Sequence, residues 1–278
     1  MNATSRGDEN PDTGSFLATE RWGLSPREHA EYAEQGCFVR RDQFTPAELE
    51  VLSAAVEAAA ERARVECGTT GHAYELDGRR FVDLGHVTVQ FEPAPHTDAI
   101  KVIEPVHEFD PVLERLISDE RLVDPMRCLL GMDRVALWTD KLNLKRPGAG
   151  TGFGWHQDSP YWMHACEDVD RLPNVMLALD EATEVNGCLR VIPGSHLRGC
   201  LPGTDDGTQL GGFYTDPRRF DAALQQALSV PAGTLVFFDP HIVHGSQANR
   251  SRLPRRALVL TYQPGGRPTL KSGRVCNV

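Results

Sequence analysis

The feature that most restricts the fold of this chain is a change of hydrophobic period near its middle. Upstream, apolar residues recur every three to four positions through an Ala- and Glu-rich stretch that begins at Pro46, directly after a threonine that can cap a helix. Downstream, Val135, Leu137, Leu142 and Leu144 fall at the spacing of a strand. The sequence therefore predicts helices first and a β-rich second half.

Turn and capping residues place further elements within this outline. Pro26 follows a serine that can cap a helix, and Gly36 ends the short helix that it begins. Residues 98–131 are expected to be helical in pieces separated by prolines, and the Gly-rich stretch 199–214 is expected to be a loop that gates a site. Helices that precede strands predict an α+β fold, in which the helices cover the outside of a β core. Strands are expected at 174–180, 188–192, 234–238 and 256–263.

Length and composition favour one domain. The chain has 278 residues, of which 40% are hydrophobic, and β barrels or sandwiches of this size often form a single unit. Residues 1–15 are polar and are predicted to be a disordered tail, which leaves 16–278 as the domain.

Charge and cysteine usage restrict the partners and the compartment. A formal charge of −10 disfavours nucleic acids and anionic membranes. No apolar run approaches the roughly 18 residues of a membrane helix, and the N-terminus lacks the apolar segment of a signal peptide. The seven cysteines include no C-x-x-C pair, as expected of thiols in a reducing compartment. We therefore expect a cytoplasmic protein that acts on a small molecule; oligomeric state has no visible signature.

Three residues have the types and the spacing of a metal site. His156 and Asp158 follow a Gly-rich turn and can point to one side of a strand end, while His244 can join them from another strand. Two imidazoles and one carboxylate on one face of a metal leave the opposite positions open, as in non-haem Fe(II) oxygenases. His241 would face away from His244, and His196 is expected to be a hydrogen-bonded loop residue.

Several short motifs lie in order between residues 22 and 265, namely Leu24-Ser25-Pro26, Phe44-Thr45-Pro46-Ala47-Glu48, Asn143-Leu144-Lys145-Arg146-Pro147-Gly148, Trp155-His156-Gln157-Asp158, Asn186-Gly187-Cys188-Leu189, Ile192-Pro193-Gly194-Ser195-His196 and His244-Gly245-Ser246. Together they resemble the phytanoyl-CoA dioxygenase family of Fe(II)/2-oxoglutarate oxygenases, which includes ectoine hydroxylase. The resemblance implies a double-stranded β-helix (a cupin-like jelly roll) buttressed by the N-terminal helices. It also implies that Fe(II), 2-oxoglutarate and O2 serve to hydroxylate an unactivated C–H bond of a small-molecule metabolite, with release of succinate and CO2.

The resemblance also assigns roles at the reaction centre. His156, Asp158 and His244 would bind Fe(II). Arg255 would pair with the distal carboxylate of 2-oxoglutarate, because a guanidinium fork matches a carboxylate bidentately. Ser246 would help to hold the same carboxylate.

Further residues are implied as contacts of the co-substrate or the substrate. Asn143 and Lys101 match co-substrate contacts in relatives, and Lys141 and Met176 stand where relatives vary in the wall of the co-substrate pocket. The resemblance implies that Trp162 contacts the substrate. Tyr161, the residue before it, is expected to line the same cavity.

Alternatives stay open at this point. Arg252 and Arg256 compete with Arg255 for the co-substrate. The same cofactors could serve desaturation or epoxidation, and similar ligands occur in zinc or manganese cupin-type hydrolases and isomerases and in metal-stabilised binding modules. Halogenation is disfavoured, because related halogenases replace the carboxylate at the position of Asp158 with a small residue.

Overall fold

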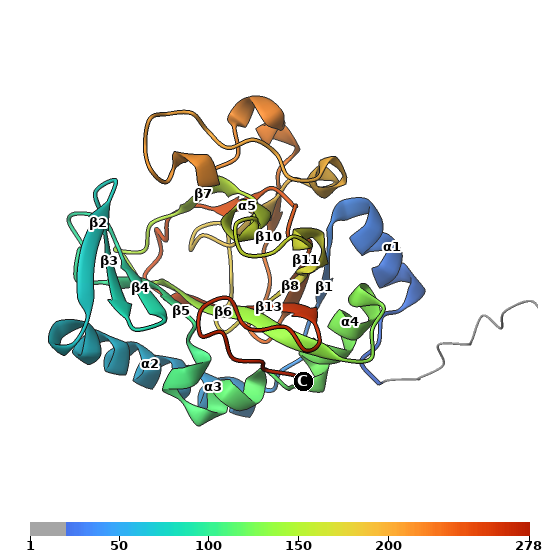
Figure 1. Cartoon of the computed structure of the whole chain (residues 1–278), viewed down its shortest axis with the longest axis horizontal. Helices are drawn as coiled ribbons and strands as arrows, with labels where there is room; N and C mark the ends of the chain where they lie inside the picture. Colours follow the sequence, from blue (N-terminus) through green and yellow to red (C-terminus); the bar gives the residue numbers. More distant parts are fainter. Residues whose placement is uncertain (1–20) are drawn as a thin grey trace, which may run out of the picture.

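The computed structural model describes residues 21–278, and the predicted tail at residues 1–15 lies outside the described part (Figure 1). Helix α1 (Pro26–Gln35) begins with a capping box formed by Ser25 and Glu28, and it ends at Gly36, which adopts a left-handed conformation with φ 81°. Both boundaries agree with the prediction from the sequence.

Helix α2 (Pro46–Thr69) is also started by a capping box, made by Thr45 and Glu48. It runs along the outside of the β structure, beneath the strands in the view of Figure 1. Small residues dominate its inner face, which lets the helix approach the strands closely. The buried positions of α2 are Leu52, Ala55, Val56, Ala59, Ala60, Ala63 and Cys67.

The strands of residues 21–278 form two antiparallel sheets. The strands of the larger sheet are β1 (Cys37–Arg40), β2 (His72–Leu76), β3 (Arg79–Leu84), β4 (Val87–Phe91), β5 (Ile100–Glu104), β6 (Val135–Lys145), β8 (Asn174–Ala178), β11 (Leu235–Phe238) and β13 (Arg255–Pro264). Their order is β1-β11-β8-β13-β6-β5-β4-β3-β2. The smaller sheet holds β7 (Phe153–His156), β9 (Leu189–Val191), β10 (Gln226–Leu228) and β12 (His244–Ser246), in the order β10-β9-β12-β7. The predicted α+β class and the jelly-roll core are confirmed, and the four strands expected in the second half lie within two residues of their predicted ends.

The prediction for residues 98–131 was partly wrong. Two helices occur there, α3 (Pro111–Leu116) and α4 (Glu120–Leu130), but β5 (Ile100–Glu104) is a strand within the larger sheet. Its sequence Ile-Lys-Val-Ile-Glu is rich in β-branched residues that pack well between neighbouring strands. The prolines indicate where the short helices lie, but they do not predict the conformation of the segment before them.

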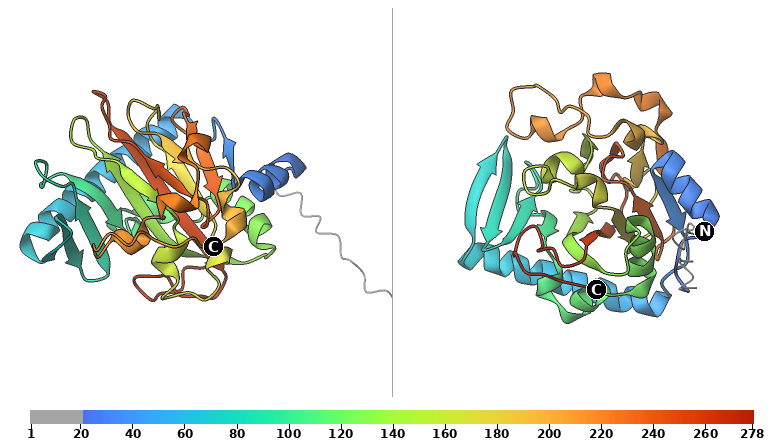
Figure 2. Two further views of the ribbon diagram at one scale, coloured as in Figure 1. Left: turned by 90° about the horizontal axis from the view of Figure 1, so that it is seen from above. Right: turned by 45° about the vertical axis from the view of Figure 1, so that its right-hand side comes forward.

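A hairpin that the sequence analysis did not anticipate extends one edge of the larger sheet (Figures 1 and 2). Strands β2 and β3 are joined by Asp77 and Gly78, which have φ values of 48° and 71°. Positive φ at both turn residues is typical of the tight turns whose twist matches that of paired strands. The remaining short helices are α5 (Ser159–Trp162) and the 3-10 turns His107–Phe109, Val169–Arg171, Ser195–Arg198, Gly211–Phe213, Pro217–Arg219 and Ala222–Leu224.

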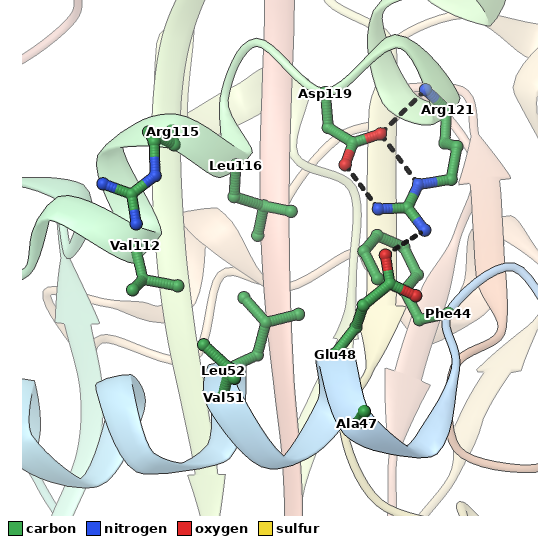
Figure 3. Close-up of a pocket in the computed structure, with 10 residues that line it drawn as sticks. All are labelled: Phe44, Ala47, Glu48, Val51, Leu52, Val112, Arg115, Leu116, Asp119 and Arg121. Carbon is green, nitrogen blue, oxygen red and sulfur yellow. Dashed lines mark hydrogen bonds and ion pairs between the residues drawn. The ribbon is translucent and has the colours of Figure 1, made fainter.

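Arg121 connects the start of α2 to α4. Its guanidinium lies 3.7 Å from the centroid of the Phe44 ring and forms ion pairs with Asp119 at 2.6 Å and with Glu48 at 2.9 Å. Figure 3 shows this cluster at one end of a shallow hollow between α2 and α3. The contacts fix the angle at which α2 leaves β1, and therefore the position of α2 on the sheet.

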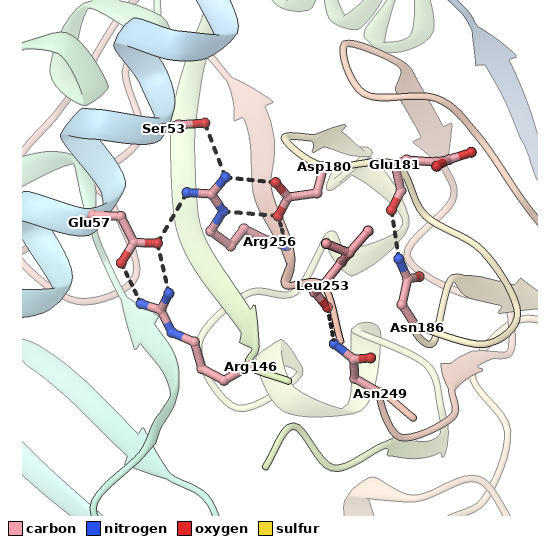
Figure 4. A network of polar contacts seen from close by, with 9 residues as sticks. All are labelled: Ser53, Glu57, Arg146, Asp180, Glu181, Asn186, Asn249, Leu253 and Arg256. Carbon is pink, nitrogen blue, oxygen red and sulfur yellow. Dashed lines mark hydrogen bonds and ion pairs between the residues drawn. The ribbon is translucent and has the colours of Figure 1, made fainter. Parts of the chain in front are cut away.

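A second polar network holds α2 against the start of β13. Arg256 binds Asp180 through two hydrogen bonds of 2.7 and 2.9 Å, and it reaches Glu57 of α2 at 3.1 Å (Figure 4). Glu57 also pairs with Arg146 at 2.6 Å. Arg256 therefore belongs to the face of the sheet that α2 covers.

We expect Arg256→Ala to lower the free energy of unfolding by about 2 kcal/mol, because it leaves the half-buried Asp180 carboxylate without its bidentate partner. Arg146→Ala is the matched control, since both partners of that pair are more exposed and such pairs contribute about 0–1 kcal/mol. Urea denaturation measures both values. Equal losses in the two variants would contradict the importance assigned to the Arg256 pair.

Candidate active site

The two predicted histidines meet across paired strands of the smaller sheet. His156 ends β7 and His244 begins β12, and the two are direct partners in the antiparallel register. Their ring centroids are 4.2 Å apart, and Asp158 Oδ2 lies 3.9 Å from His244 Nε2. One potential ligand atom from each of the three residues lies within 4.8 Å of the others. A single metal ion can therefore contact all three side chains.

Hydrogen bonds fix which nitrogen of each imidazole faces the metal position. His156 Nδ1 lies 2.7 Å from the carbonyl of Gly154, and His244 Nδ1 lies 3.0 Å from the carbonyl of Ile242. A carbonyl only accepts hydrogen bonds, so each Nδ1 carries a proton, and Nε2 is the nitrogen that can present a lone pair to a metal. Such contacts orient metal-binding imidazoles in many proteins.

The third member of the triad is oriented from the larger sheet. Asp158 comes after β7 ends, in a helical conformation that turns the chain into α5, so the shared strand face predicted for it with His156 does not apply. Its Oδ2 accepts a hydrogen bond from Asn174 Nδ2 at 3.1 Å, and Thr261 Oγ1 donates to Asn174 Oδ1 at 2.6 Å. The carboxylate is therefore held by a chain of contacts and does not depend on strand geometry.

The protonation states suit a metal ion. Burial lowers the pKa of His156 to about 3, and the neighbouring His244 acts in the same direction. Burial raises the pKa of Asp158, but Lys141 and the two histidines outweigh it, and the net shift is downward. At neutral pH His156 is uncharged and Asp158 is ionised, which are the forms that bind metals.

A cavity of about 580 Å³ lies between the two sheets and contains the triad. Alternate residues of β6 and β13 face it, because side chains two apart share one face of a strand. Asn143 from β6, Ser246 from β12 and Met176 from β8 line the cavity, together with Arg255. These predicted co-substrate contacts therefore surround one continuous space.

Arg255 is the most unusual residue of the cavity. Its side chain is buried, and within residues 21–278 it forms no ion pair, while its Nε has no hydrogen-bond partner. Burial lowers its pKa to about 10, so that it remains a cation at neutral pH. An unpaired buried cation is costly unless an anion joins it. The site therefore fits a ligand that brings a carboxylate to this position.

The structure separates Arg255 from its two competitors. Arg256 faces the other side of β13, towards Glu57 and Asp180, and Arg252 is exposed in the turn before the strand. Alternation along β13 explains this difference, because neighbouring residues of a strand point to opposite faces.

Lys145 is a buried lysine next to Arg255 that the sequence analysis did not single out. The two residues are partners across β6 and β13, and Lys145 Nζ donates a hydrogen bond to Ser246 Oγ at 2.8 Å. Burial lowers the pKa of Lys145 to about 6. Arg255 and Lys101 contribute to this lowering, whereas Glu92 and Cys188 act in the opposite direction.

Binding of a dianion beside Lys145 should restore its ammonium form. We expect 2-oxoglutarate binding to take up as much as one proton, and the affinity to fall by up to about tenfold per pH unit as the pH rises above about 6. Calorimetry in two buffers of different ionisation enthalpy measures this uptake. Lys145→Met should abolish it, and an unchanged uptake in that variant would assign the proton to another group.

The other predicted contacts have partners of their own. Lys101 is buried and donates to Thr151 Oγ1 at 2.7 Å and to the carbonyl of Gly152 at 2.8 Å, and it does not line the cavity. Lys141 does line it, with Nζ 3.8 Å from Asp158 Oδ1 and 4.0 Å from Glu104 Oε1. Lys141 therefore contacts the metal triad directly.

Aromatic residues form another wall of the cavity. Tyr161 and Trp162 line the cavity as predicted, and Tyr161 stacks on Phe213 with ring centroids 4.5 Å apart. Phe213 and Tyr214 come from the Gly-rich stretch that was expected to gate a site. Sequence reasoning missed both residues individually, since an aromatic in a loop has no signature of its own.

The remaining histidines with competing assignments lie outside the cavity. His241 is in a turn, and its Nδ1 lies 2.8 Å from Ser159 Oγ. His196 Nε2 lies 3.2 Å from the carbonyl of Ala33, in keeping with a hydrogen-bonded loop residue. Neither lines the wall that contains the triad.

A jelly roll that presents two histidines and one carboxylate beside a buried, unpaired arginine defines a class of enzyme, the 2-oxoglutarate-dependent non-haem iron dioxygenases. Comparison with known proteins refines this class. A family model described as phytanoyl-CoA dioxygenase (PhyH) matches residues 32–257, and the chain belongs to this family.

Individual relatives support the same assignment. L-proline trans-4-hydroxylase of Streptomyces griseoviridis is 33% identical over 185 residues, covering 60% of this chain and 68% of that protein. Ectoine dioxygenase of Sphingopyxis alaskensis is 33% identical over 182 residues, covering 60% of this chain and 59% of the relative, which is less than two thirds of its length. The crystal structure of EctD from S. alaskensis with 2-oxoglutarate and 5-hydroxyectoine has a TM-score of 0.65 and 28% identity, over 91% of this chain and 78% of that one.

Proposed function

We propose that this enzyme hydroxylates an unactivated C–H bond of a small-molecule metabolite and converts 2-oxoglutarate and O2 to succinate and CO2. The observation that carries the proposal is the juxtaposition of an ionised carboxylate, two imidazoles with free Nε2 atoms and an unpaired Arg255 in one cavity. A metal hydrolase would use the three ligands but would have no use for the arginine. The arginine therefore favours an oxygenase.

Each residue of the cavity then has a defined task. His156, Asp158 and His244 would hold Fe(II) on one side, which leaves positions open on the other. Arg255 would bind the distal carboxylate of 2-oxoglutarate, with Ser246 donating a hydrogen bond to the same group. When bound, the iron and the co-substrate supply the oxidising power for C–H cleavage, and the protein supplies orientation and shielding.

Further residues shape the space around these groups. Asn143 lines the cavity, where its amide can donate to the co-substrate, and Met176 lines it from β8. We propose that Lys101 supports this region through the loop that it binds, and that Lys141 orients Asp158. Trp162 and Tyr161 would exclude water from the substrate side, because they cover the triad with apolar surface.

The setting that we propose is a reducing cytoplasm. All seven cysteines are free thiols, as is usual for proteins of that compartment. In residues 21–278 no helix combines the length and the apolar character needed to cross a bilayer. The substrate would therefore reach the cavity as a small molecule from solution.

The proposal is tested under anaerobic conditions with purified protein, Fe(II) and 2-oxoglutarate. We expect a weak visible charge-transfer band that needs both additions, and succinate formation once O2 is admitted. Replacing Fe(II) by Zn(II) should preserve 2-oxoglutarate binding but abolish succinate formation. A protein that binds metal but gives no band and no succinate would refute the oxygenase assignment.

A further inference from the structure

Arg79 is a second cation of the cavity without a counterion. It is the first residue of β3, directly after the Asp77-Gly78 turn, and it lines the cavity from the hairpin. Within residues 21–278 it forms no ion pair, and its guanidinium donates a hydrogen bond to the hydroxyl of Tyr214. The guanidinium carbon also lies 5.4 Å from the centroid of the Tyr214 ring. The contacts of Arg79 therefore leave its charge uncompensated.

The positive charges that line the cavity outnumber the carboxylates that could balance them. Apart from the triad, the charged residues that line it are Arg79, Glu104, Lys141, Arg255 and Lys271. Glu104 lies beside Lys141, and Lys271 donates to a hydroxyl, Thr88 Oγ1, at 3.0 Å. If the proposed function is correct, 2-oxoglutarate neutralises Arg255. Positive charge then remains on the side formed by the hairpin.

Tyr214 lies close to the reaction centre, and the side chains of Arg79 and Tyr214 are only partly exposed. The backbone of Tyr214 forms a β-bridge with that of His156, which belongs to the triad. Asp77, at the tip of the hairpin, accepts hydrogen bonds from the backbone N–H groups of Gln209 at 3.2 Å and Leu210 at 2.7 Å. The hairpin and the loop that carries Tyr214 are thus joined over the cavity.

The hydroxyl of Tyr214 can act together with Arg79. It accepts the hydrogen bond from Arg79 and still has its own proton to donate. A guanidinium and a hydroxyl that converge on one point form a strong site for an oxyanion, because both donate charge-assisted hydrogen bonds to it. The aromatic residues next to them can cover an apolar body of the same molecule.

We propose that Arg79 and Tyr214 bind an anionic group of the substrate, a carboxylate or a phosphonate, and so hold its carbon skeleton against the aromatic wall with the reactive carbon towards the triad. This inference rests on the proposed function and names the chemical class of its substrate. It predicts that small organic anions bind, and that their neutral analogues do not.

The test uses wild-type protein loaded anaerobically with Fe(II) and stoichiometric 2-oxoglutarate, and three probes measured by calorimetry. The probes are 3-phenylpropanoate, 2-phenylethylphosphonate and the uncharged 3-phenylpropanamide. We expect one or both anions to bind at millimolar concentration or below, and the amide to bind more weakly by about tenfold or more. Preference between the two anions distinguishes a carboxylate site from a phosphonate site.

Variants assign the effect to Arg79. Arg79→Gln should weaken anion binding by about tenfold or more and leave the amide unchanged, and Arg79→Lys should restore part of the loss. Arg80→Gln is the matched control, because Arg80 stacks on Phe91 at 4.3 Å, lies 3.7 Å from Asp98 and does not line the cavity. It should leave all three affinities unchanged.

The outcomes also separate this inference from the proposed function. If wild-type protein binds 2-oxoglutarate, but binds the amide as tightly as the anions or binds none of the probes, the anion site is refuted and the oxygenase assignment stands. Equal losses in Arg79→Gln and Arg80→Gln refute it as well. If 2-oxoglutarate itself does not bind, the proposed function is refuted.

Discussion

Replacing Asp158 by alanine should reduce succinate formation to background and weaken Fe(II) binding severely. The carboxylate is the one acidic member of the triad, and its loss leaves two imidazoles, which bring no negative charge to the metal. We expect the loss of metal affinity to exceed the roughly 10- to 100-fold that removal of a residue merely supporting a ligand causes. Equilibrium Fe(II) titration and a succinate assay measure the two effects separately.

Asn174→Ala is a graded control for this experiment. Asn174 does not reach the metal position but donates to Asp158 Oδ2 at 3.1 Å. Its removal should cost about 10- to 100-fold in metal affinity, less than the removal of Asp158. Turnover that survives in Asp158→Ala, or an equal loss in both variants, would mean that the metal is held by other residues.

Replacing Arg255 by alanine should weaken the binding of 2-oxoglutarate by about 100-fold, because truncating one partner of a buried charge pair costs about 2–5 kcal/mol. The maximal rate at saturating co-substrate should change much less, since the arginine binds a carboxylate that does not react. Calorimetry gives the affinity, and succinate formation at high 2-oxoglutarate gives the rate.

Arg256→Ala provides the control within the same strand, and stability provides a second measurement. Arg256 is fully paired, so its loss should destabilise the fold and leave 2-oxoglutarate affinity unchanged. Arg255 is unpaired without co-substrate, so its loss should not destabilise the protein and could stabilise it. A loss of affinity in Arg256→Ala alone would reverse the assignment of the two arginines.

The N-terminal helices and the second-half strands could be predicted from sequence because their signals are local. The capping boxes at Ser25 and Thr45 and the turns between strands act over a few residues. Strand β5 was mistaken for helix, since its identity depends on pairing with β4 and β6. The hairpin β2–β3, by contrast, has a local signal in its Asp77-Gly78 turn, which the sequence analysis overlooked.

For the candidate site too, local patterns in the sequence identify some residues, and only the tertiary structure identifies the others. A motif marks His156 and Asp158, and strand alternation explains why Arg255 faces the cavity and Arg256 does not. No pattern distinguishes Arg79 from Arg80, because only the tertiary structure decides which of them faces the cavity.

The hairpin β2–β3 forms the outermost part of the larger sheet, and β2 is its edge strand. The triad, by contrast, lies on and directly after strands of the smaller sheet, and Arg255 comes from the middle of the larger one. Insertions or exchanges in the hairpin would therefore leave the iron-binding machinery in place. Evolution could adapt such a scaffold to new metabolites by remodelling this appendage alone, and protein engineers could graft hairpins between relatives for the same purpose.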